Sequence, residues 1–155
     1  MDAHLVGRSF SQDPALVTTL GKIVINTLQQ RGILAVAKHF PGLGKSDLDP
    51  HIHLPTIHAA IEEMESVHLA PFQGAIETNV AAIMTSHAVY PALEPGKPAT
   101  LSKTITTDLL RKKMHFSGLV ISDDLEMGAI AKESGLPEGA AAAFEAGIDL
   151  LLICK

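Results

Sequence analysis

The feature that most constrains the fold of this chain is the regular alternation of helical segments with short apolar runs. Apolar residues recur at helical spacing over residues 15–30, 57–78, about 100–114 and an alanine-rich stretch ending at 146. Between and after these segments lie four short apolar runs, which we interpret as buried strands: residues 33–37, 80–84, 118–121 and 148–153. This alternation predicts an α/β fold with parallel strands covered by helices.

Polar, reactive residues follow each of the first three predicted strands. Binding and catalytic groups of α/β folds collect at the carboxyl ends of parallel strands. We therefore expect one shared site built from three dipeptides: Lys38-His39, Ser86-His87 and Asp123-Asp124.

The composition argues against some classes of binding partner. A net charge of -5, one Tyr and no Trp make nucleic acid an unexpected partner. The single cysteine, Cys154, fits a reducing compartment and, in its apolar run, predicts a core residue. No apolar run reaches the ~18 residues of a membrane span. We expect a cytoplasmic protein, with secretion left open, and the oligomeric state is not predicted.

The loop after the first strand contains a carboxylate and an imidazole two residues apart, Asp49 and His51. In an extended backbone both side chains point the same way, so the carboxylate could orient the ring as a general acid/base. The alternative is a pair of solvated loop residues. His51 and His53 lack a third metal ligand, so we expect no metal and no cofactor. Gly42 and Gly44 are expected to permit tight turns.

Asp123 and Asp124 also admit two interpretations. A carboxylate at a strand end can act as a nucleophile, and only one of two adjacent residues would face the site. The alternative is a helix N-cap. Lys38 and His39 can hold hydroxyls or anions, or can simply end a strand. Ser86 and His87 diverge and are not expected to form a nucleophile pair.

Taken together, four motifs resemble glycoside hydrolase family 3, in its bacterial β-N-acetylhexosaminidase branch. They stand in family order over residues 7–14, 38–55, 83–92 and 118–127. Two positions depart from the usual pattern: Leu43 replaces a histidine, and Pro50 replaces a small serine. The first departure raises a question of loop packing rather than of chemistry.

The resemblance implies a role for each matching position. Asp123 matches the catalytic nucleophile, His51 the histidine acid/base, and Asp49 its dyad partner. The residues that match sugar-binding positions are Arg8, Lys38 and His39. The implied reaction is retaining hydrolysis of terminal β-N-acetylglucosaminyl residues through a covalent glycosyl-aspartate.

The resemblance also implies a (β/α)8 barrel, which typically needs ~250 residues. We therefore expect residues 1–155 to be an incomplete barrel, without the first strands and the last βα unit. The expected partner is an N-acetylglucosamine-containing glycan. Two alternatives stay open: another family 3 activity such as a β-glucosidase, and an inactive or sugar-binding fragment.

Overall fold

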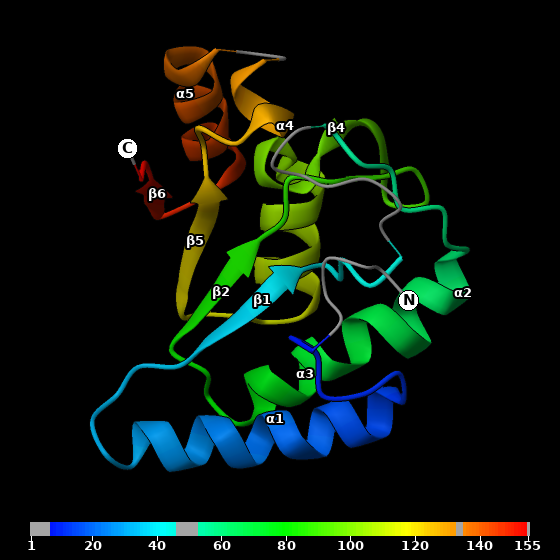
Figure 1. Cartoon of the computed structure of the whole chain (residues 1–155), viewed down its shortest axis with the longest axis vertical. Coiled ribbons are helices and arrows are strands. Elements are labelled where there is room, and N and C mark those ends of the chain that lie inside the picture. Colours follow the sequence, from blue (N-terminus) through cyan, green and yellow to red (C-terminus); the bar gives the residue numbers. More distant parts are fainter. Residues whose placement is uncertain (1–6, 46–52, 133–134, 155) are drawn as a thin grey trace.

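The computed structural model describes residues 7–45, 53–132 and 135–154. Four parallel strands form one sheet in the order β1-β2-β5-β6. Their carboxyl ends therefore lie at one edge, as the arrows of β1, β2 and β5 show (Figure 1). The strands are β1 (Val36–Phe40), β2 (Ala82–Thr85), β5 (Leu119–Asp124) and β6 (Leu150–Leu152). This sheet confirms the predicted α/β class.

The strands extend further into polar sequence than predicted. Phe40 of β1 pairs with Thr85, and Asp124 of β5 pairs with Leu152. Pairing with neighbouring strands keeps this part of the chain extended, which the apolar pattern could not indicate. His39 and Asp123 therefore stand on the sheet itself rather than in the loops that follow it.

Helices flank the sheet, and α1 packs along α3 (Figure 1). At the start of α1 the Asp13 carboxylate accepts from the N–H of Ala15 at 2.9 Å, and Gly32, beyond its end, has φ +78°. The helices are α1 (Pro14–Gln29), α2 (Ile61–Glu63), η1 (Met64–Leu69), α3 (Ala70–Glu77), η2 (Ala99–Leu101), η3 (Thr104–Lys113), α4 (Gly128–Ala131) and α5 (Leu136–Ala146).

The predicted helix over residues 57–78 begins later, at Ile61, and does not break at Pro71. Elements α2, η1 and α3 follow one another without a gap, so Pro71 stands inside a continuous helix. The backbone widens to a π-helix in η1, directly before α3, where the ring and the missing N–H of a proline disturb regular α-helical hydrogen bonds. The next predicted helix is capped by Ser102, whose Oγ accepts from the N–H of Ile105 at 2.9 Å.

A small antiparallel hairpin was not predicted. Its strands are β3 (Val89–Tyr90) and β4 (Glu94–Pro98), in a proline-rich segment whose composition is typical of a loop. Prolines lower the strand propensity of this segment. Tertiary contacts of Val89 and Tyr90, described below, hold the hairpin in place.

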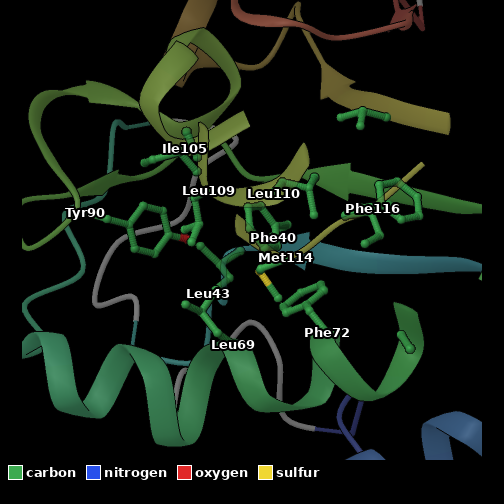
Figure 2. Close-up of a cluster of buried hydrophobic side chains, with 14 of the residues drawn as sticks. Phe40, Leu43, Leu69, Phe72, Tyr90, Ile105, Leu109, Leu110, Met114 and Phe116 are labelled. Carbon is green, nitrogen blue, oxygen red and sulfur yellow. The ribbon is translucent and has the colours of Figure 1, made fainter. Parts of the chain in front are cut away.

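The main hydrophobic cluster lies between the sheet and its helices (Figure 2). Phe40 of β1 meets Phe72 of α3 edge to face, with ring centroids 5.2 Å apart. Leu43 is buried in the same cluster, so an apolar residue fits the position where the family pattern has histidine. The prediction for Cys154 was wrong, because this residue is exposed beyond the end of β6.

Candidate active site

Two side chains from non-adjacent strands meet at the carboxyl edge of the sheet. His39 of β1 places Nε2 3.5 Å from Oδ2 of Asp123 on β5. Strand β2 lies between β1 and β5, so the two side chains meet beyond its end. The His39 side chain is 10% exposed and that of Asp123 is 22% exposed, so a ligand can still reach the carboxylate. The predicted convergence of these two strand ends is confirmed.

The two adjacent aspartates have different environments. Asp123 accepts from the N–H of Asp124 on Oδ1 at 2.9 Å, and its Oδ2 faces His39. Asp124 accepts on Oδ1 from the N–H groups of Glu126 at 3.0 Å and Cys154 at 3.4 Å. Asp124 thus holds the turn after β5. The alternative prediction of a helix N-cap was wrong, because α4 has Met127 at its N-cap and no side-chain cap. Asp123 is the aspartate that faces the site.

Two positively charged side chains act on His39 of the His39–Asp123 pair. Lys38, on the same strand, and Arg8, in the segment before α1, are both exposed. The charges of both side chains lower the pKa of His39. Of the described candidates, the structure thus places His39 against Asp123, with the charges of Lys38 and Arg8 acting on His39.

His39 is neutral in this environment at neutral pH. Burial lowers its pKa from 6.5 to about 4, and the Asp123 carboxylate opposes that decrease only in part. A neutral imidazole has one N–H donor and one acceptor nitrogen. His39 can thus exchange hydrogen bonds with a hydroxyl group, while Lys38 and Arg8 supply charge.

The turn after β1 fixes where His39 stands. Gly42 has φ +130°, and a Cβ on it would lie 2.8 Å from Nδ1 of His68. Its N–H donates to the carbonyl of His39 at 2.8 Å, and its own carbonyl accepts from the hydroxyl of Tyr90 at 3.0 Å. The expectation of a tight turn is confirmed for Gly42. Gly44 also stands in a turn, but a Cβ on it would meet open space.

The predicted Asp49 and His51 dyad lies outside the described residues, as do the neighbouring residues 46–52. The chain on both sides of this segment is held by β3. Tyr90 bonds to Gly42 before the segment. After it, Val89 exchanges backbone hydrogen bonds with Pro55 at 2.9 Å and Ile57 at 2.8 Å. The hairpin therefore anchors the predicted acid/base segment at both ends.

The family of the chain follows from a match that covers almost its whole length. A family model for the glycosyl hydrolase family 3 N terminal domain matches residues 2–155. The chain belongs to glycosyl hydrolase family 3. The resemblance inferred from the four motifs is confirmed.

Curated relatives in family 3 carry the name beta-hexosaminidase. The protein from Tolumonas auensis is 40% identical over 155 residues, and that from Hydrogenovibrio crunogenus is 36% identical over 155 residues. These alignments cover 99% of this chain but 46% and 43% of those proteins. The chain thus spans less than half the length of the curated relatives it matches.

Solved family 3 structures share the fold. A β-N-acetylglucosaminidase from Paenibacillus sp. str. FPU-7 superposes with a TM-score of 0.96 at 42% identity, over 98% of this chain and 29% of that one. NagZ from Neisseria gonorrhoeae in complex with N-trifluoroacetyl-D-glucosamine gives a TM-score of 0.89 at 36% identity, over 99% and 44%. The four parallel strands are thus part of a family 3 N-terminal barrel.

Sequence reasoning missed the buried polar network of this family 3 site. It placed Ser86 and His87 at the shared site as a divergent pair, and the structure confirms that the two side chains diverge. The Ser86 hydroxyl meets the Tyr90 hydroxyl at 2.8 Å, whereas His87 contacts Thr100 and the backbone of Asp124. The signal available was a histidine directly after a buried strand. Its partner Thr100 stands 13 residues along the chain, and no local pattern connects the two.

Two further findings concern the described residues only. No group of three or more His, Cys, Asp or Glu side chains among them is placed to hold a metal ion. No helix in the described ranges is long and apolar enough to cross a membrane.

Proposed function

We propose that the protein containing this chain is a retaining, exo-acting β-N-acetylglucosaminidase with Asp123 as its nucleophile. The observation that carries the proposal is the asymmetry of the two aspartates. Asp123 presents one oxygen toward His39 and the exposed edge of the sheet, whereas Asp124 is engaged by backbone N–H groups. The names of the family 3 relatives support the substrate class.

In the first step, Oδ2 of Asp123 attacks the anomeric carbon and forms a C–O bond. The bond from that carbon to the leaving oxygen breaks, and a general acid gives that oxygen a proton. His51, oriented by Asp49, is proposed as this acid from the family resemblance. Water then attacks the anomeric carbon of the glycosyl ester, and His51 takes a proton from this water. The bond between that carbon and Asp123 breaks, which restores the carboxylate and releases the sugar with its anomeric configuration retained.

Neighbouring residues hold the sugar in this account. Neutral His39 donates one hydrogen bond to a sugar hydroxyl or accepts one from it, and Lys38 and Arg8 donate to hydroxyl oxygens. A histidine acid is neutral after it gives up its proton, so it does not repel an anionic leaving sugar. Muropeptides and chitooligosaccharides are the proposed natural substrates, and peptidoglycan recycling in the cytoplasm is the proposed setting.

The experiment compares two chromogenic substrates, using the full-length protein. We expect turnover of p-nitrophenyl N-acetyl-β-glucosaminide and at least ~100-fold lower kcat/KM on p-nitrophenyl β-glucoside, because a site built to bind a polar group discriminates against its absence. Preferential turnover of the glucoside would replace the proposal with a β-glucosidase. Binding of N-acetylglucosamine without turnover of either substrate would replace it with a sugar-binding role.

A further inference from the structure

The carboxyl end of β2 carries a histidine that the proposed mechanism does not use. His87 is 1% exposed, and both of its ring nitrogens have partners. Nδ1 lies 2.8 Å from the hydroxyl oxygen of Thr100, and Nε2 lies 2.9 Å from the backbone carbonyl oxygen of Asp124. Asp124 directly follows the proposed nucleophile, so this ring supports the backbone next to Asp123.

The contacts define the tautomer of His87. A carbonyl oxygen only accepts, so Nε2 carries the hydrogen. Burial lowers the pKa of His87, so the ring is neutral at neutral pH and Nδ1 is an acceptor. The hydroxyl of Thr100 must therefore donate to Nδ1, because two lone pairs facing each other at 2.8 Å would repel.

The same reasoning assigns donor and acceptor roles to the hydroxyl groups of Thr100 and Thr85. The hydroxyl of Thr100 also donates to the carbonyl of Ser86 at 3.0 Å, so its one hydrogen is shared between that carbonyl and Nδ1 of His87, which both only accept. The oxygen of Thr100 then accepts from the hydroxyl of Thr85 at 2.9 Å. Donation then runs in one direction, from Thr85 through Thr100 and His87 to the carbonyl of Asp124. All three side chains are fully or almost fully buried.

Hydrogen bonds of the Asp124 backbone connect His87 to Asp123. Its carbonyl accepts from His87 and from the N–H of Met127 at 3.0 Å, while its own N–H donates to Oδ1 of Asp123 at 2.9 Å. The orientation of the peptide groups on either side of Asp124 therefore determines which oxygen of Asp123 accepts this hydrogen bond. The other oxygen is the one that faces the site.

We infer that His87 is a positioning residue that aims the Asp123 carboxylate, and that Thr100 fixes the tautomer in which it does so. The catalytic consequence rests on the proposed function of Asp123. A misplacement of about 1 Å can cost on the order of a hundredfold in rate, so even a partial loss of this support is measurable.

The test uses two buried threonines as a matched pair. Thr100→Val removes the donor to Nδ1 and leaves the ring. Thr106→Val removes an equally buried hydroxyl, which donates to the carbonyl of Ala99 at 3.2 Å and does not contact His87. We expect Thr100→Val to lower kcat on the aryl N-acetylglucosaminide about tenfold with KM within about twofold, and Thr106→Val to change kcat less than about twofold. Equal losses in both variants would overturn the inference.

A second measurement does not depend on turnover. Nitrogen-15 NMR of the imidazole should show the Nε2–H tautomer of His87 in the parent and in Thr106→Val, and a mixture of tautomers in Thr100→Val. The carboxyl carbon resonance of Asp123 should shift in Thr100→Val and stay in place in Thr106→Val. An Nδ1–H tautomer in the parent, or an unmoved Asp123 resonance in Thr100→Val, would overturn the inference.

The two readouts separate this inference from the proposed function. If the parent hydrolyses no glycoside, the proposed function fails, and the NMR comparison alone decides whether His87 positions Asp123. A third variant pair decides the same question from the ring itself. His87→Gln keeps an N–H donor and should retain more of the parent's Asp123 chemical shift than His87→Leu, which removes it. Equal shifts in the two variants would count against the inference.

Discussion

Nε2 of His39 lies 3.5 Å from Oδ2 of Asp123, across the end of the strand that separates β1 from β5. Opposing effects act on the histidine in this contact. Burial and the charges of Lys38 and Arg8 lower its pKa, and the carboxylate of Asp123 raises it. Since burial is the largest of these effects, the pKa is about 4 and the ring is neutral at neutral pH.

Opposite charge changes should move the pKa of His39 in opposite directions. Asp123→Asn removes the anion that favours the protonated ring, so the pKa of His39 should fall further. Lys38→Met removes a cation that disfavours it, so the pKa should rise. Imidazole resonances followed by NMR during a pH titration measure both. Shifts of the same sign in the two variants would contradict the described arrangement.

Stability should decrease on acidification because His39 is held neutral. Its folded pKa of about 4 lies below the unfolded value of about 6.5, so the unfolded chain binds the proton first as the pH falls. The gap corresponds to about 3 kcal/mol, lost progressively from about pH 6.5 down to about pH 4. Urea unfolding across this range measures the loss, and His39→Gln should show a shallower dependence. An equal slope in the variant would refute the explanation.

Gly42 should tolerate no side chain. Gly42→Ala places an L-residue at φ +130° and a methyl group 2.8 Å from the ring of His68, so we expect a loss of about 3 kcal/mol or more. Gly96→Ala is the control for the backbone alone. Its φ is +82° in open space, so about 1–2 kcal/mol is expected. Denaturant unfolding compares them, and equal losses would show that His68 does not restrict the turn.

Arg111 should contribute more stability than the neighbouring lysine ion pair. Its guanidinium bonds to the side chain of Asp149, and that carboxylate also accepts from the N–H of Val120 at 2.7 Å. Arg111→Met leaves Asp149 without its cation where β5 begins, so we expect a loss of about 2 kcal/mol. Lys112→Met breaks only the exposed pair with Asp108, where about 0.5 kcal/mol or less is expected. Thermal or urea unfolding that ranks the variants in reverse would contradict this.

The sequence predicted the parallel sheet and the meeting of its strand ends because hydrophobic periodicity and strand direction are local, repeated signals. The alternation of side chains along a strand also predicted that only one of Asp123 and Asp124 would face the site, and the family resemblance indicated Asp123. The ends of β1 and β5 could not be placed, since pairing with β2 and β6 extends them into polar sequence.

The supporting residues were harder to find from sequence. Thr100 and Tyr90 act through contacts between residues that are far apart in sequence, such as Tyr90 and Gly42, which are 48 positions apart. The β3–β4 hairpin depends on such contacts in spite of its prolines. Cys154 shows the reverse error: an apolar run predicted burial, but the residue follows the end of β6 and is exposed.

The most direct test of Asp123 as the nucleophile is to trap the proposed covalent intermediate. The full-length protein is incubated with a fluorinated N-acetylglucosaminyl fluoride, whose glycosyl ester hydrolyses slowly, and is then digested and analysed by mass spectrometry. The account predicts one sugar on the peptide containing Asp123, assigned to that residue by fragmentation and missing in Asp123→Asn. A sugar ester on Asp124 or on any other carboxylate would contradict it.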